Sequence, residues 1–134
     1  MNKPKVSVAV IIVKEGKVLL GKRKGTYGAE TWGFPEGHLE FNESIDECAK
    51  KAVVDETGME IKNLKEGIFT NDIFKKENEH CVTCFVISEY NSGKLENKNP
   101  EKYDEWNWFD WHKLPTPLFR PVRNYILKEY NLLV

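Results

Sequence analysis

The sequence predicts one domain of the α/β (α+β) class, spanning residues 1–134. Three observations support this prediction. A chain of 134 residues with 40% hydrophobic residues has the length of one ordinary domain and enough apolar side chains for a buried core. A helix with clear start and stop signals lies at residues 43–57, between segments that have the composition of strands. A second helical pattern follows the last strand, so helices and strands are expected to pack in layers.

The segments before the first helix favour short strands. Residues 6–13 are rich in β-branched side chains and alternate weakly, which predicts a well-buried strand. A turn at 15–16 leads to a second strand at 18–21, and the two strands are expected to form a hairpin. A loop at 26–30 then precedes a short strand at 31–34.

The segments after the helix predict further strands and a final helix. Residues 61–73 form an extended segment, and a polar hairpin connection leads to a strong strand at 80–90. The polar stretch 94–105 predicts a loop. The strand at 106–111 has aromatic side chains on both faces, and helical spacing predicts the last helix at 119–130.

The helix at 43–57 carries a carboxylate where an apolar residue is expected. Asn42 and Ser44 are both candidate N-caps, and Gly58 is placed for a left-handed C-cap. At ~100° per residue, one apolar stripe is formed by Ile45, Cys48, Ala49, Ala52 and Val53. Glu56 falls in the middle of that stripe, where a carboxylate is costly unless a cation or strong donors hold it.

Two interpretations of Glu56 stay open on helix geometry alone. The carboxylate either caps an adjoining loop or pairs with a buried Arg, or it binds a divalent cation together with Asp55 at the edge of the same face. Hard cations such as Mg²⁺ take few carboxylates and complete their shell with water and substrate phosphates.

The stretch 37–59 resembles the Nudix box, the signature of the Nudix hydrolases. The box reads G, five residues, E, seven residues and REUxEExGU, where U is a bulky aliphatic residue. The matching positions in this chain are Gly37, Glu43, Val53, Asp55, Glu56, Gly58 and Met59. The resemblance extends over nearly the whole chain, and the segments LLGKRKGTYG and NPEKYDEWNWFDWHKLP are similar to the MutT-like branch that hydrolyses nucleoside triphosphates.

This resemblance implies the Nudix fold, a mixed sheet sandwiched between helices. It also implies a hydrolase that uses Mg²⁺, with Mn²⁺ as a substitute, and cleaves a nucleoside diphosphate linked to another group. The leading expectation is a nucleoside triphosphate cut to monophosphate and pyrophosphate, with Glu56 and Asp55 as metal ligands. The implied partner is a small nucleotide, and which nucleotide is bound stays open.

The box of this chain departs from the family pattern in three places. Lys51-Ala52 stands in place of Arg-Glu, Asp55 replaces a Glu, and Glu36 precedes Gly37 where the family usually has Gly. The change at Ala52 removes a family carboxylate that ligates metal or activates water. One hypothesis is that Glu36 supplies the missing oxygen; the alternative is that Glu36 is a solvated loop residue. The second functional hypothesis is a nucleotide-binding or regulatory module with impaired catalysis.

The resemblance also implies roles for residues outside the helix. Arg23 is expected to contact the outer phosphate, unless its basic run is merely a solvated strand end, and Gly37 and His38 are expected near the phosphates. Arg120 stands where relatives carry an aromatic residue in the wall of the base pocket. Asp104 and Glu101 are alternative general bases. In the box, structural roles are expected for Glu43, Lys51 and Gly58, with Glu43 bracing its loop or pairing with Lys51.

Composition excludes several other classes of protein. The net charge of −1 gives no basic excess for a nucleic-acid polymer. No apolar run approaches the ~18 residues of a membrane span, and no small-residue cleavage site follows the apolar residues near the start. Three cysteines, an odd number, fit a reducing compartment, so a cytoplasmic protein is expected. Dimers are common among Nudix proteins, but no feature of the sequence decides the oligomeric state.

Overall fold

The structure is a computed structural model that describes residues 2–25 and 27–133. Its elements are β1 (Lys5–Lys14), β2 (Lys17–Arg23), β3 (Trp32–Gly33), β4 (Glu36–His38), α1 (Ile45–Thr57), β5 (Glu60–Phe74), β6 (Glu79–Ser92), β7 (Tyr103–Asp110) and α2 (Arg120–Leu133). This order confirms the predicted class. Strand β4 was not predicted, and β7 begins three residues before the expected strand because Tyr103 is fully buried and pairs with Arg23. No helix among the described residues is long and apolar enough to cross a membrane.

The seven strands form one mixed sheet whose main path runs β3-β2-β1-β6-β5. Strands β1 and β6 pair in parallel, whereas β1 and β2 form the predicted antiparallel hairpin. Away from the hairpin turn, β1 and β2 pair with other strands. The first half of β1 pairs with β4, and the end of β2 pairs with β3. The segment 32–38 therefore lies between the diverging ends of β1 and β2, which brings the end of β2 close to the start of β4.

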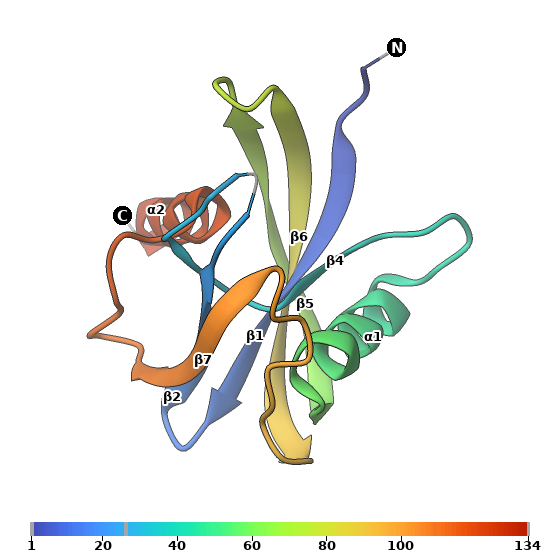
Figure 1. The fold of residues 1–134 in the computed structure, drawn as a ribbon, viewed down its shortest axis with the longest axis vertical. Coiled ribbons are helices and arrows are strands. Elements are labelled where there is room, and N and C mark those ends of the chain that lie inside the picture. Colours follow the sequence, from blue (N-terminus) through green and yellow to red (C-terminus); the bar gives the residue numbers. More distant parts are fainter. Residues whose placement is uncertain (1, 26, 134) are drawn as a thin grey trace.

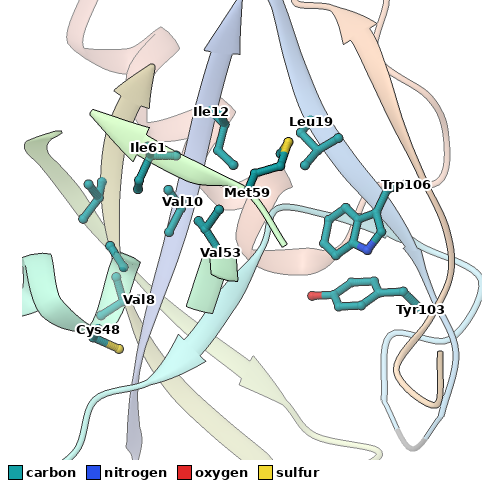
Figure 2. Packing of buried hydrophobic residues seen from close by; sticks show 12 residues of the cluster. Val8, Val10, Ile12, Leu19, Cys48, Val53, Met59, Ile61, Tyr103 and Trp106 are labelled. Carbon is teal, nitrogen blue, oxygen red and sulfur yellow. The ribbon is translucent and has the colours of Figure 1, made fainter. Parts of the chain in front are cut away.

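The two helices cover opposite faces of the sheet, on either side of the central strands in Figure 1. Alternation along β1 explains this arrangement, because successive side chains of a strand point to opposite faces. Val8, Val10 and Ile12 pack in a cluster with Val53 of α1, part of which is shown in Figure 2. On the other face, a second cluster joins Ala9, Ile11 and Phe85 to Val122 and Tyr125 of α2. The predicted sandwich of helices around a mixed sheet is confirmed.

Helix α1 begins two residues later than the sequence suggests and ends at the expected glycine. Ser44 is the N-cap, and it forms a capping box with Glu47 in which each side chain accepts a hydrogen bond from the other's backbone N–H. Glu43 therefore lies in the preceding loop and not in the first turn. Gly58 has φ 74°, and its N–H donates to the carbonyl of Val54.

Replacing Gly58 by alanine should destabilise the protein by about 1–2 kcal/mol, because a Cβ is strained in the left-handed conformation. The new Cβ would also lie 3.2 Å from Lys98 Cε. Urea unfolding followed by circular dichroism measures the change. Gly58→Asn is the control and should cost less, since Asn tolerates this conformation better. Equal stability of Gly58→Ala and the unaltered protein would contradict the role of this C-cap.

Candidate active site

The last turn of α1 carries a buried carboxylate, Glu56, whose side chain lies in the apolar stripe. The residue is only 4% exposed. Its Oε1 accepts hydrogen bonds from the backbone N–H of Glu36 at 3.0 Å and the hydroxyl of Tyr103 at 3.2 Å. Its Oε2 accepts one from Lys102 Nζ at 2.7 Å. Burial raises the pKa of Glu56, and the ammonium of Lys102 opposes that rise.

A second buried carboxylate, Glu36, opens strand β4. Arg23 Nη1 donates to its Oε1 at 2.8 Å, and Lys102 Nζ lies 3.6 Å from the same oxygen. Burial alone would raise the pKa of Glu36, but the two cations hold it below its ordinary value. Glu36 is therefore not a solvated loop residue, since it is 8% exposed and paired with cations on two sides.

The cation at the end of β2 is held firmly in place. Arg23 is 4% exposed, and its guanidinium carbon lies 3.8 Å from the ring centre of Phe119 and 5.4 Å from that of Tyr27. Its Nε has no hydrogen-bond partner among the described residues. Arg23 is thus no solvated strand end; its Nη1 bonds to Glu36, and a contact with substrate phosphate stays a prediction.

Lys102 joins the two carboxylates into one cluster. Its Nζ lies 2.7 Å from Glu56 Oε2, 3.6 Å from Glu36 Oε1 and 3.5 Å from the backbone carbonyl oxygen of Glu36. Three oxygens from two different elements therefore converge on one ammonium group. We refer to Arg23, Glu36, Glu56 and Lys102 as the charge cluster.

Sequence reasoning missed Lys102 and Tyr103, because both fall in the polar stretch that predicts a loop. Tyr103 is fully buried, and its ring packs against that of Trp106 at a centroid distance of 4.2 Å (Figure 2). The available signal was Glu56 itself, since a carboxylate in an apolar stripe needs a cation. A lysine followed by an aromatic residue inside a polar stretch is a candidate for that cation.

A cavity of about 250 Å³ is lined by the segment 36–43 and by one face of α1. Ala52 lines it, together with the carboxylates of Asp55 and Glu56. Gly37 also lines it and lies so close to α1 that a Cβ there would be 3.1 Å from the Cβ of Ala52. Other lining residues are Glu36, His38, Glu40, Glu43, Cys48, Lys51 and Asn99. This cavity is predominantly acidic.

A second cavity, of about 410 Å³, lies on the side of Arg23 and Lys102. It is lined by Arg23, Glu36 and Lys102 of the charge cluster and, beside them, by Lys24, Gly25 and Tyr27. The two cavities share Glu36, His38 and Asn99, so they adjoin one another. An acidic hollow thus borders a hollow with three basic side chains and one aromatic ring.

The predicted acids are distributed unequally over these cavities. Asp55 is exposed at the acidic cavity, and Glu101 is exposed at the basic one. Asp104 is also exposed, but its carboxylate lies 3.7 Å from Lys24 Nζ and lines neither cavity. Glu43 braces its loop by accepting a hydrogen bond from the Glu40 N–H at 3.0 Å.

Two of the predicted substrate residues, His38 and Arg120, differ in whether they line the two cavities. His38 lines both cavities, and its Nδ1 lies 3.3 Å from the hydroxyl of Ser7. Arg120 lines neither cavity; its guanidinium carbon lies 5.4 Å from the ring centre of Phe74, beside a separate hollow near the β5–β6 turn. The structure therefore brings His38, but not Arg120, to the candidate site.

The oxygen atoms available at the site decide whether it can hold the divalent metal that the Nudix resemblance implies. Among the described residues, no three His, Cys, Asp or Glu side chains are grouped to hold a metal ion. However, oxygens of Glu56 and Glu36 already converge on one cation, the ammonium of Lys102. Mg²⁺ commonly takes one or two protein carboxylates and completes its shell with water and substrate phosphates. The residues therefore fit a Mg²⁺ that is bound together with a substrate, and not a site built from protein ligands alone.

Comparisons with known proteins identify the family of the chain. The family model described as "NUDIX domain" matches residues 2–130. The "Oxidized purine nucleoside triphosphate hydrolase" of Danio rerio is 28% identical over 83% of this chain and 69% of its own length. The "ADP-ribose pyrophosphatase" of Methanocaldococcus jannaschii is 29% identical over 95% of this chain and 73% of its own length. A crystal structure of a MutT NUDIX hydrolase from Burkholderia pseudomallei superposes with a TM-score of 0.86 at 26% identity, covering 96% of this chain and 98% of the other.

These matches show that the chain belongs to the NUDIX domain family. Within that family it is a Nudix-type pyrophosphohydrolase with an altered box. With alanine at position 52, Glu56 is the buried carboxylate of the helix, and Lys102 Nζ donates a hydrogen bond to it.

Proposed function

We propose that the protein hydrolyses a nucleoside triphosphate to monophosphate and pyrophosphate in a reaction that requires Mg²⁺. The observation that carries this proposal is the pair of adjoining cavities, one acidic and one basic, that meet at the charge cluster. A polyphosphate needs both sides: carboxylates for its metal ion and cations for the charge that the metal does not neutralise. The relative from Danio rerio is named as a hydrolase of such a substrate, an oxidized purine nucleoside triphosphate.

Each side of the site has a distinct role in this proposal. Glu56 and Asp55 would hold Mg²⁺, which would neutralise phosphate charge and help to activate water when bound. Lys24 and Lys102 line the basic cavity and would bind phosphate oxygens. Arg23 would act mainly by fixing the position of Glu36, because its Nη1 is already bonded there.

The general base is better sought at Glu101 than at Asp104. Glu101 lines the basic cavity, whereas Asp104 lies beside Lys24 and lines neither cavity. A base must come within hydrogen-bond reach of the attacking water, directly or through one further water. Tyr27 is an aromatic residue that lines the same cavity, and its ring would pack against the nucleobase.

A second candidate function is nucleotide binding without efficient turnover. Two observations favour it: Ala52 brings no carboxylate to the acidic cavity, and Lys102 occupies Glu56. The binding module and the enzyme share the same cavities, so they differ in turnover and not in location.

The first experiment is to measure release of pyrophosphate and phosphate from a panel of nucleotides, with Mg²⁺, with Mn²⁺ and with chelator. We expect pyrophosphate release from one class of triphosphate, abolished by chelator. The panel includes ADP-ribose, because one relative is named for that substrate. Glu56→Gln serves as the control for contaminating phosphatases. Silence across the panel, with Mg²⁺-dependent nucleotide binding intact, would instead support the binding module.

A further inference from the structure

We infer that Lys102 is a built-in counter-ion that occupies the divalent-cation position on Glu56, so that a metal ion binds there only when Lys102 leaves. This inference rests on the proposed Mg²⁺-dependent function and deepens it. It predicts that the substrate-free protein binds divalent cations weakly, and that metal and nucleotide assist each other's binding.

The position of the ammonium group is the first argument. Lys102 Nζ contacts a carboxylate oxygen of Glu56 and lies within 3.6 Å of both a side-chain and a backbone oxygen of Glu36. Converging carboxylate and carbonyl oxygens are the surroundings that hard divalent cations prefer. An ammonium group and a metal ion cannot share these oxygens at the same time.

The charge balance of the cluster is the second argument. Two carboxylates, Glu36 and Glu56, face two cations, Arg23 and Lys102, so the buried group is formally neutral. A divalent cation added to this neutral group would bring two uncompensated positive charges into a poorly solvated site, which is costly. Departure of Lys102 removes one positive charge, and substrate phosphates supply the negative charges that balance the rest.

The exposure of Lys102 is the third argument. Its side chain is 28% exposed, whereas the side chain of Arg23 is 4% exposed, so Lys102 is the cation that can move. Lys102 borders the basic cavity beside Lys24. A polyphosphate in that cavity would attract the ammonium away from Glu56 and open the oxygens to the metal ion. Nucleotide and metal would then bind cooperatively, and this coupling is reciprocal by thermodynamic linkage.

The test measures binding of Mn²⁺ alone to the substrate-free protein by electron paramagnetic resonance. We expect Lys102→Met to bind Mn²⁺ at least about tenfold more tightly than the unaltered protein, the change that a competition of ~1.4 kcal/mol produces. Lys98→Met is the matched control, because Lys98 lies in the same connecting segment but pairs with the exposed Glu96 at 3.8 Å. The control should bind Mn²⁺ like the unaltered protein.

The cooperativity is tested with a triphosphate whose α,β bridge is a methylene group and resists cleavage. It should tighten Mn²⁺ binding by the unaltered protein more than binding by Lys102→Met, in which the ammonium no longer competes. Equal Mn²⁺ affinity of Lys102→Met and the unaltered protein would overturn the inference. Circular dichroism checks that the variant folds, and Lys102→Gln, which keeps a donor to Glu56 without the charge, replaces it if it does not.

The two proposals fail in different ways. Tighter Mn²⁺ binding by Lys102→Met, with no pyrophosphate released from any nucleotide, would reject the enzymatic function and leave the lysine–metal exchange standing. Efficient Mg²⁺-dependent hydrolysis, with no effect of Lys102→Met on Mn²⁺ affinity, would leave the enzymatic function standing and reject the exchange.

Discussion

Replacing Arg23 by methionine should lower the free energy of unfolding by about 3 kcal/mol, the low end of the cost of breaking a buried ion pair. Methionine keeps much of the packing against Phe119 but leaves Glu36 without its hydrogen bond from Nη1. Lys102 stays 3.6 Å from the same carboxylate oxygen, which is why the low end is expected. Thermal unfolding followed by circular dichroism should show a midpoint lower by roughly 10 °C.

A double-mutant cycle separates the charge from the packing. Arg23→Met combined with Glu36→Gln should be less destabilised than the sum of the two single variants, because no uncompensated charge is then left at this position. Additive effects would mean that Arg23 stabilises the fold by packing alone. That result would contradict the structural role assigned to the Arg23–Glu36 pair.

The second large effect is expected at Ala52, where glutamate should raise kcat/KM for Mg²⁺-dependent pyrophosphate release by at least about tenfold, a gain of ~1.4 kcal/mol at the transition state. Ala52 lies one turn before Glu56, so a carboxylate there would reach the same face of α1. Ala52 lines the cavity of about 250 Å³ together with Asp55 and Glu56. Initial rates over a range of nucleotide and Mg²⁺ concentrations measure the change.

Val54→Glu is the matched control for this gain. Val54 lies on the exposed face of the same helix, with 46% of its surface accessible. A glutamate at this position therefore adds the same charge outside the two cavities. It should leave the rate unchanged. If Ala52→Glu also brings no gain while the unaltered protein is already active, the site works through other groups, and Lys102 would be the first to consider.

Local signals were sufficient to predict helix α1 and the carboxylate in its apolar stripe. Ser44 and Gly58 mark its ends, and Glu56 interrupts an apolar stripe that the structure buries. The β1–β2 hairpin follows from a short turn between two strand-like segments. These features depend on residues close in the sequence, where periodicity and capping rules apply directly.

The partners of Glu56 could not be predicted in the same way. Lys102 lies 46 residues further along the chain, in a stretch whose polar composition favours a loop. The pairing of Arg23 with Glu36 depends on β3 and β4 entering between the diverging ends of β1 and β2. Both contacts arise from the path of the sheet, which no local pattern specifies. The resemblance to Nudix proteins predicted the fold but neither of these two contacts.

The parallel pairing of β1 with β6 also bears on how the protein is made. Lys5 pairs with Cys81 and Val13 with Glu89, so the partners are separated by more than half the chain. Strand β1 leaves the ribosome before β6, which follows only after the helix and β5 have been synthesised. Pairings between such distant segments slow folding and expose apolar strands in the meantime. The apolar residues of β1 therefore stay without their parallel neighbour until β6 has been synthesised.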